Sequence, residues 1–187
     1  MATFVAMLRS VNVAGRNRLP MADLRALVSG LGFKGVTTYL QSGNVVFSGT
    51  GTPKAVARAI GQEIATGLGL EVPVVVRSGQ QLKKTIESAP FSDRGVDPKT
   101  RHVTFLAGLP EPNAVEGLVA LDGRFGTDRF QVVGCDVFLH CPGGYGETKL
   151  TNAFLERRLG VVATTRNWRT VLALADIAGV PTGGAGA

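Results

Sequence analysis

The sequence predicts an α+β protein built from two ferredoxin-like-related β-α-β-β-α-β units with antiparallel sheets, plus extra helices. Two hairpin patterns lead to this prediction: one at residues 37–48, TTYLQSGNVVFS, and one of the same design at residues 129–140. Segments with helical periodicity flank each hairpin. Between them, residues 89–100 are rich in Pro, Gly and Asp, which is typical of a linker.

The first unit begins with an apolar run at Phe4–Leu8, which predicts a buried strand. A polar loop, Ser10–Leu19, leads into a helix over residues 20–31, where apolar residues recur at helical spacing. The hairpin at 37–48 follows. Its strands are expected at Thr37–Leu40 and Val45–Ser48, because Gly and Asn between them tolerate positive φ.

A second helix is expected after Thr52, whose hydroxyl suits an N-cap. The strand at Leu70–Arg77 contains Pro73, which cannot donate to a β-ladder, so we expect this strand at a sheet edge. The pattern Ser78-x-x-Gln81 is a capping box and predicts a short third helix.

The second unit repeats the order of the first. Its expected elements are a strand at Arg101–Ala107, a weak helix at Pro112–Leu121, hairpin strands at Arg129–Val133 and Val137–His140 around a turn at Gly134-Cys135-Asp136, a helix at Lys149–Leu159, a strand at Val161–Thr165 and a terminal helix capped by Asn167. We therefore place the first domain at residues 1–88, the linker at 89–100 and the second domain at 101–180. The tail, 181–187, has too little apolar surface to bury and is expected to be disordered.

The net charge of the 187-residue chain is +6, and it is unevenly distributed. Residues 1–89 contain ten basic and four acidic side chains, whereas residues 90–187 contain ten of each. Such asymmetry is typical of proteins with an anionic partner, although a modest positive balance also keeps a protein soluble. No apolar run is long enough to span a membrane. With no basic region of a signal peptide and only two cysteines, we expect a cytoplasmic location and no membrane partner.

Three polar stretches are candidate ligand-binding segments. The first is the loop at residues 9–18, where Arg9, Asn12, Arg16 and Asn17 supply donors just before a helix N-terminus. The alternative is a solvated basic loop with Asn in turn positions. The second is the hairpin turn with Gln41, Ser42 and Asn44, whose amides and hydroxyl also suit turn chemistry alone.

The third stretch includes Lys149 and Asn152, which are expected on one face of a helix, and Arg166, Asn167 and Trp168, which follow it. Trp168 could stack on a base or sugar, or belong to the core. The preceding glycine-rich loop, CPGGYGET, does not fit a phosphate-binding loop, because Thr148 precedes the lysine and Leu150 follows it.

Catalytic and metal sites have little support. The two histidines, His102 and His140, lie in predicted strands, and the spacing of His140 to Cys135 and Cys141 matches no metal motif. The carboxylates are scattered, so no acid and base pair is identified. The sequence indicates no cofactor and favours a protein that is not an enzyme.

The segments VAMLRSVNVAGRNRLPMADL, LGFKGVTTYLQSGNVVFS and PGGYGETKLTNAFLERRLGVVATTRNWRTVLAL, with the strand VPVVVRS, resemble the bacterial domain-of-unknown-function family 1697. The resemblance covers residues 3–178. It implies two ferredoxin-like-related α+β subdomains and no particular activity. The family motifs fall mostly on polar donors and amides of the three candidate stretches, which favours binding or hydrogen bonding between the halves.

We therefore expect a non-enzymatic binding protein whose basic, amide-rich face takes an anionic ligand, either nucleic acid or a phosphorylated metabolite. Two alternatives stay open. One is an enzyme with an interdomain cleft, where Arg9, Lys149 or Arg166 holds a phosphate or carboxylate. The other is a purely structural role for the polar residues at the contact between the halves. The sequence does not indicate the oligomeric state.

Overall fold

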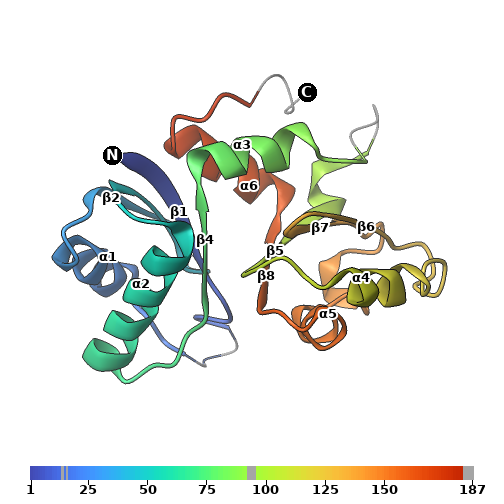
Figure 1. Ribbon diagram of the computed structural model, residues 1–187, viewed down its shortest axis with the longest axis horizontal. Coiled ribbons are helices and arrows are strands. Elements are labelled where there is room, and N and C mark those ends of the chain that lie inside the picture. Colours follow the sequence, from blue (N-terminus) through green and yellow to red (C-terminus); the bar gives the residue numbers. More distant parts are fainter. Residues whose placement is uncertain (14, 16, 92–95, 183–187) are drawn as a thin grey trace. The chain divides into compact units, whose positions relative to one another are not determined.

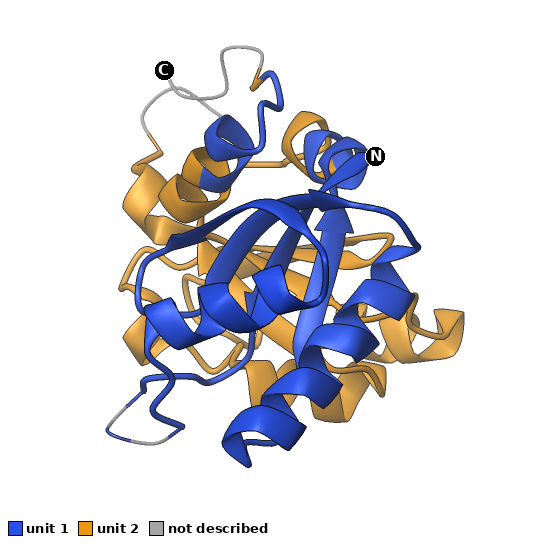
Figure 2. Cartoon of the chain, turned by 90° about the vertical axis from the view of Figure 1, so that its left-hand side faces the viewer, with its two compact units in different colours: residues 1–84, 174–181 blue, residues 85–173, 182–187 orange. Residues whose placement is uncertain are grey.

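The structure, a computed structural model, describes residues 1–13, 15, 17–91 and 96–182. It contains two four-stranded antiparallel sheets with accompanying helices, which confirms the predicted fold class (Figure 1). The chain divides into two compact units (Figure 2): unit 1 comprises Met1–Lys84 and Leu174–Pro181, and unit 2 is built on Thr85–Ala173. The domain limits expected from the sequence stay predictions, because the linker and the tail lie partly outside the described residues.

Unit 1 has the element order β-α-β-β-α-β. Its elements are β1 (Ala2–Leu8), α1 (Met21–Gly30), β2 (Lys34–Tyr39), β3 (Asn44–Gly49), α2 (Pro53–Leu68) and β4 (Val74–Ser78). The strand order is β2-β3-β1-β4, and β1 pairs antiparallel with both neighbours. β4 is therefore an edge strand, as predicted, but it begins at Val74, so Pro73 precedes the strand and does not lie within it.

The core of unit 1 lies between its sheet and the helices α1 and α2. Phe4, Ala6 and Leu8 alternate along β1 and belong to this core. Ile60 and Ile64 from α2, four residues apart, pack into the same cluster. Burying an aliphatic or aromatic side chain of this size contributes about 1.5–3 kcal/mol. Period-two alternation in the strand and helical spacing in α2 thus bring the apolar residues together.

Unit 2 repeats the topology of unit 1. Its elements are η1 (Pro98–Thr100), β5 (Arg101–Leu106), α4 (Pro112–Val119), β6 (Arg129–Val133), β7 (Asp136–His140), η2 (Tyr145–Glu147), α5 (Asn152–Leu159) and β8 (Ala163–Asn167). The strand order β6-β7-β5-β8 corresponds position by position to β2-β3-β1-β4. Two further helices, α3 (Gly79–Glu87) and α6 (Trp168–Ile177), cross the division between the units. The large repeat predicted from the hairpins is therefore present in the sheets.

The two faces of the unit 2 sheet carry different residues. Leu106 at the end of β5 packs with Leu118 of α4 and Leu155 of α5, which defines the α4–α5 face. His102 and Thr104 share this face with Leu106, because alternate residues of a strand point the same way. Residues at odd positions of β5, such as Val103, point to the opposite face. This division decides which side chains can meet.

The start of α5 differs from its prediction. The helix begins at Asn152, and Thr151 is its N-cap, with its Oγ1 accepting a hydrogen bond from the Phe154 N–H at 3.2 Å. Thr148, which precedes the predicted start of the helix, accepts from the Leu150 N–H at 3.1 Å and has an extended backbone conformation. Burial of the Leu150 side chain is compatible with this extended path. Lys149 is therefore not on the helix, and its predicted shared face with Asn152 is wrong.

The turn of the second hairpin also differs from its prediction. It contains two residues, Gly134 and Cys135, because Asp136 already pairs with Val133. Gly134 has a φ of 59°, which supplies the positive φ that a two-residue hairpin turn requires. This shorter turn sets the register of the pocket residues described below.

The turn of the first hairpin provides a test of local packing. A Cβ added at Gly43, where φ is +75°, would lie 2.5 Å from Val11 Cγ2 and 2.9 Å from Leu8 Cβ. We expect Gly43→Ala to lower the free energy of unfolding by about 1–2 kcal/mol for the positive φ, and by about 1–3 kcal/mol more for overpacking. The control, Gly69→Ala, has a φ of +64° and open space around it, so it keeps only the first cost. Urea unfolding measures both variants, and equal losses would contradict the packing account.

Candidate functional site

The first candidate stretch is a loop folded around Asn12. The Asn12 Oδ1 accepts from the Leu19 N–H at 2.8 Å, and its Nδ2 donates to the Leu19 carbonyl at 2.9 Å. The same Nδ2 donates to the Gln41 carbonyl at 2.8 Å. Asn17 donates from its side chain to the Ser10 carbonyl at 3.0 Å. The side chain of Asn12 thus ties the loop to itself and to the hairpin turn.

The hairpin turn uses its polar side chains in a similar way. Asn44 is fully buried, and its Nδ2 donates to the Tyr39 carbonyl at 2.9 Å and to the Ser42 Oγ at 3.0 Å. The Gln41 side chain is exposed. Arg9 lies at the loop entrance, where it donates to the Ser10 Oγ at 3.2 Å. Arg16 lies outside the described residues.

The second cluster of amides lies on the α4–α5 face of unit 2. The hydroxyls of the cross-strand partners Thr104 and Thr165 form a hydrogen bond of 2.7 Å. The Thr165 hydroxyl donates in turn to Asn152 Oδ1 at 2.7 Å. Asn167 donates to the Lys99 carbonyl at 2.9 Å, and its Oδ1 accepts from the Arg169 N–H at 3.0 Å. These bonds close the end of the sheet and cap α6.

His102 adds a titratable group to this cluster. Its Nε2 lies 3.3 Å from the Asn167 Nδ2, which assigns Nε2 as the acceptor. The Tyr145 ring stacks on the imidazole at a centroid distance of 4.9 Å. Burial lowers the pKa of His102, an effect that the backbone of Thr100 partly offsets. The imidazole is therefore neutral in the folded protein near pH 7.

Arg166 lies on the other face of the sheet from Asn167, because successive residues of β8 alternate, and Trp168 is the first residue of α6. Arg166 is 8% exposed and donates to the Thr164 hydroxyl at 2.8 Å and to the Thr165 carbonyl at 2.9 Å. Burial lowers its pKa to about 10, so it stays cationic at neutral pH. Trp168 is buried beneath the Arg101 guanidinium, 4.3 Å from its ring centroid. The three consecutive candidates therefore do not converge on one point.

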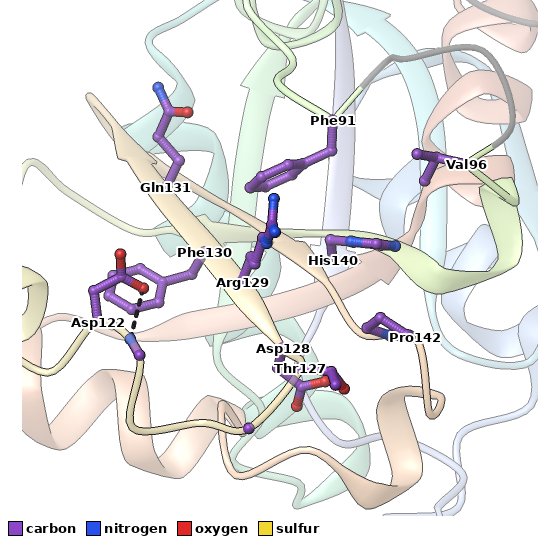
Figure 3. A pocket seen from close by; sticks show the side chains of 12 residues that line it. Phe91, Val96, Asp122, Thr127, Asp128, Arg129, Phe130, Gln131, His140 and Pro142 are labelled. Carbon is purple, nitrogen blue, oxygen red and sulfur yellow. Dashed lines mark hydrogen bonds between the residues drawn. The ribbon is translucent and has the colours of Figure 1, made fainter.

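A pocket of about 870 Å³ lies in unit 2, and none of these predicted residues lines it (Figure 3). Its size is within the range of small-molecule sites. It is lined by Phe91, Val96, Asp122, Gly123, Gly126, Thr127, Asp128, Arg129, Phe130, Gln131, His140 and Pro142. The loop between α4 and β6, the hairpin β6–β7 and the residues Phe91 and Val96 thus form its walls.

One wall of the pocket is cationic and aromatic. Arg129 pairs with His140 across β6 and β7, so both side chains point to the face opposite α4 and α5. The centroids of the Phe91 and His140 rings are 5.9 Å apart. The Arg129 guanidinium is exposed, and it makes no hydrogen bond or ion pair with the residues that the structure describes. It is available to a ligand.

The other wall comes from the loop after α4. Thr127 and Asp128 lie on the far side of the pocket from Phe91 (Figure 3). The Asp122 Oδ1 accepts from the Gly123 N–H at 3.0 Å, which fixes that carboxylate in its turn. The pocket therefore offers a cation and an imidazole near Phe91, a hydroxyl and a carboxylate at Thr127 and Asp128, and a second carboxylate at Asp122 beside Phe130 (Figure 3).

None of the pocket residues is among the ligand-binding residues predicted from the sequence. His140 was considered only as a metal ligand, and no group of three possible metal ligands occurs within the described ranges. The signal that could have found the pair is hairpin register. A two-residue turn at Gly134 places residue 129 opposite residue 140, on one face.

Cys141 is not an activated nucleophile. Cys141 is buried, and burial raises its pKa to about 11, although the Thr148 hydroxyl partly opposes this. The thiol therefore stays protonated at neutral pH and packs as a small apolar group with Leu150 and Leu155. Both cysteines are free thiols.

These features define an α+β protein of two ferredoxin-like units, with a polar pocket in unit 2. The chain belongs to the family described as "Protein of unknown function (DUF1697)", whose model matches residues 1–138. A comparison with curated proteins gave no match. Among solved structures, the conserved bacterial protein SP0830 from Streptococcus pneumoniae is similar, with a TM-score of 0.71 and 19% identity over 95% of this chain and 98% of that chain. At this identity the likeness shows the fold alone.

No helix in the described part of the chain is long and apolar enough to cross a membrane.

We predict that the Asn12 side chain is a structural tie. Asn12→Asp removes the two donated bonds to Leu19 and Gln41 and places a carboxylate against their carbonyls. The expected loss of unfolding free energy is about 2–4 kcal/mol, because each unmatched polar group costs about 1–3 kcal/mol. The control, Asn17→Asp, loses one exposed bond and should cost under about 1.5 kcal/mol. Denaturant unfolding of both variants measures the difference, and similar small losses would contradict the tie.

We also predict that His102 makes stability pH-dependent. Because its pKa is lowered in the folded state from the ordinary 6.5, unfolding takes up a proton at acidic pH. Stability is therefore highest above pH 6.5 and falls as the pH drops below that value. Thermal unfolding at about pH 7.5 and about pH 5 measures this loss. His102→Gln should show a smaller loss between the two conditions than the natural chain, and an unchanged loss would show that other groups cause it.

Proposed function

We propose that unit 2 is a binding module for a small anionic metabolite, which it holds in the pocket between Phe91, Arg129 and the loop after α4. The observation that carries this proposal is the pairing of Arg129 with His140 on one wall of an 870 Å³ pocket. Guanidinium and imidazole groups both donate to phosphate and carboxylate oxygens. The site differs from the amide-rich loops that the sequence favours.

The hydrogen bonds of the predicted residues support this change of location. Asn12 and Asn44 direct their side-chain donors to carbonyls and a hydroxyl within unit 1. Asn152 and Asn167 bond to neighbouring groups within unit 2. A ligand would have to displace these bonds, whereas the Arg129 guanidinium has no bond with a described residue to lose.

The distribution of charge and the cysteines add two further arguments. The residues of unit 1 include ten basic and four acidic side chains, so the net charge of +6 lies there. A net positive charge favours the association of a chain with anions in general. Free thiols at Cys135 and Cys141 suit a reducing compartment, and we propose a cytoplasmic location.

The test is isothermal titration of the whole chain with ribose 5-phosphate, adenosine monophosphate and citrate as probes. At least one should bind, and Arg129→Gln should weaken that binding by about tenfold or more, since a charge-assisted hydrogen bond contributes about 1.5–3 kcal/mol. The matched control is Arg124→Gln, which removes one exposed cation from the same loop region but does not line the pocket.

If both substitutions weakened probe binding equally, the cause would be general electrostatic attraction, and the proposed binding in the pocket would be wrong. Binding of a short RNA that is equally sensitive to Arg124→Gln and Arg129→Gln would favour the nucleic-acid alternative instead. Retention of all binding in Arg129→Gln would also contradict the proposal.

A further inference from the structure

The pocket contains two opposed sets of polar groups, and their chemistry restricts the ligand further. Arg129 and His140 provide donors on the wall with Phe91. Asp122 and Asp128 line the pocket from the loop after α4. A ligand with anionic groups only would be attracted by the first set and repelled by the second. The ligand must therefore present donors on the side away from its anion.

The lining also contains a hydroxyl and a carboxamide, and these indicate which kind of donor the ligand presents. Thr127 and Gln131 line the same pocket, and a hydroxyl or a carboxamide both donates and accepts. An ammonium group can only donate, so it could use the acceptors of these two exposed side chains but not their donors. Sugar hydroxyls do both, and they match a lining that mixes carboxylates, a hydroxyl and an amide.

The Phe91 ring supplies an apolar surface beside the cationic wall. It is half-buried and lies against His140, with 5.9 Å between ring centroids. The C–H face of a sugar ring can pack on such an aromatic surface while its hydroxyls reach the opposite wall. The apolar ring, the cation and the acceptors then contact three different parts of one molecule.

We propose that the ligand of this pocket is a phosphorylated sugar, with its phosphate at Arg129 and His140 and its hydroxyls at Asp128 and Asp122. This inference rests on the proposed function, because it assigns a ligand class to the same pocket. It excludes bare phosphate and aminated phosphates as the preferred ligands.

The experiment is isothermal titration of the full chain with ribose 5-phosphate, inorganic phosphate and phosphoethanolamine, repeated in Asp128→Asn. In the natural chain, ribose 5-phosphate should bind at least about tenfold more tightly than the other two. Asp128→Asn should weaken ribose 5-phosphate by about threefold to tenfold, because a good acceptor is lost. The same change should strengthen the binding of inorganic phosphate, because a repelling charge is removed.

The matched control is Glu116→Gln, an exposed carboxylate of α4 that does not line the pocket. It should leave the preference for ribose 5-phosphate unchanged. Tighter binding of phosphoethanolamine than of ribose 5-phosphate would overturn the sugar assignment and leave an anion-binding pocket. Equal effects of Asp128→Asn on ribose 5-phosphate and inorganic phosphate would also overturn it. Loss of binding for all three probes would contradict the proposed function itself.

Discussion

The pairing register of β6 and β7 is the constraint on which the candidate site depends. A two-residue turn with Gly134 at positive φ places Val133 opposite Asp136, and Arg129 then lies opposite His140. Because side chains alternate along a strand, a slip of one residue would turn the Arg129 side chain to the α4–α5 face, into the apolar core. The burial of Phe130 on that face resists such a slip. Packing of the core thus positions the polar groups of the pocket.

Polar side-chain donors serve two different purposes in this chain: some stabilise the backbone, and others are open to a ligand. The side-chain amides of Asn12, Asn44 and Asn167 donate to backbone carbonyls at loop and strand ends. An unpaired polar group at a buried position such as Asn44 would cost about 1–3 kcal/mol. The contribution of these amides is to hold loops of unusual backbone conformation in place; Asn12 itself has a φ of 54°. The exposed Arg129 side chain forms no such hydrogen bond with the described residues. Among polar side chains, those without an internal partner are the better candidates for a ligand.

Much of the fold could be predicted from the sequence, because hairpin signals, helical periodicity and Pro73 each act locally. The site could not. A turn over Gly134-Cys135-Asp136 predicts a register one residue away from the real one, and this places His140 on the face of Phe130 rather than that of Arg129. In the third candidate stretch, alternation along β8 sends Arg166 and Asn167 to opposite faces, which neighbouring positions in the sequence do not reveal.

The measurement that tests the central claim most directly is a crystal structure of the chain soaked with ribose 5-phosphate. The account predicts phosphate density within hydrogen-bonding distance of Arg129 and His140, and sugar density that extends from Phe91 toward Asp128. Density for the ligand at the Asn12 loop or at the Asn152–Asn167 cluster, with an empty pocket, would contradict it.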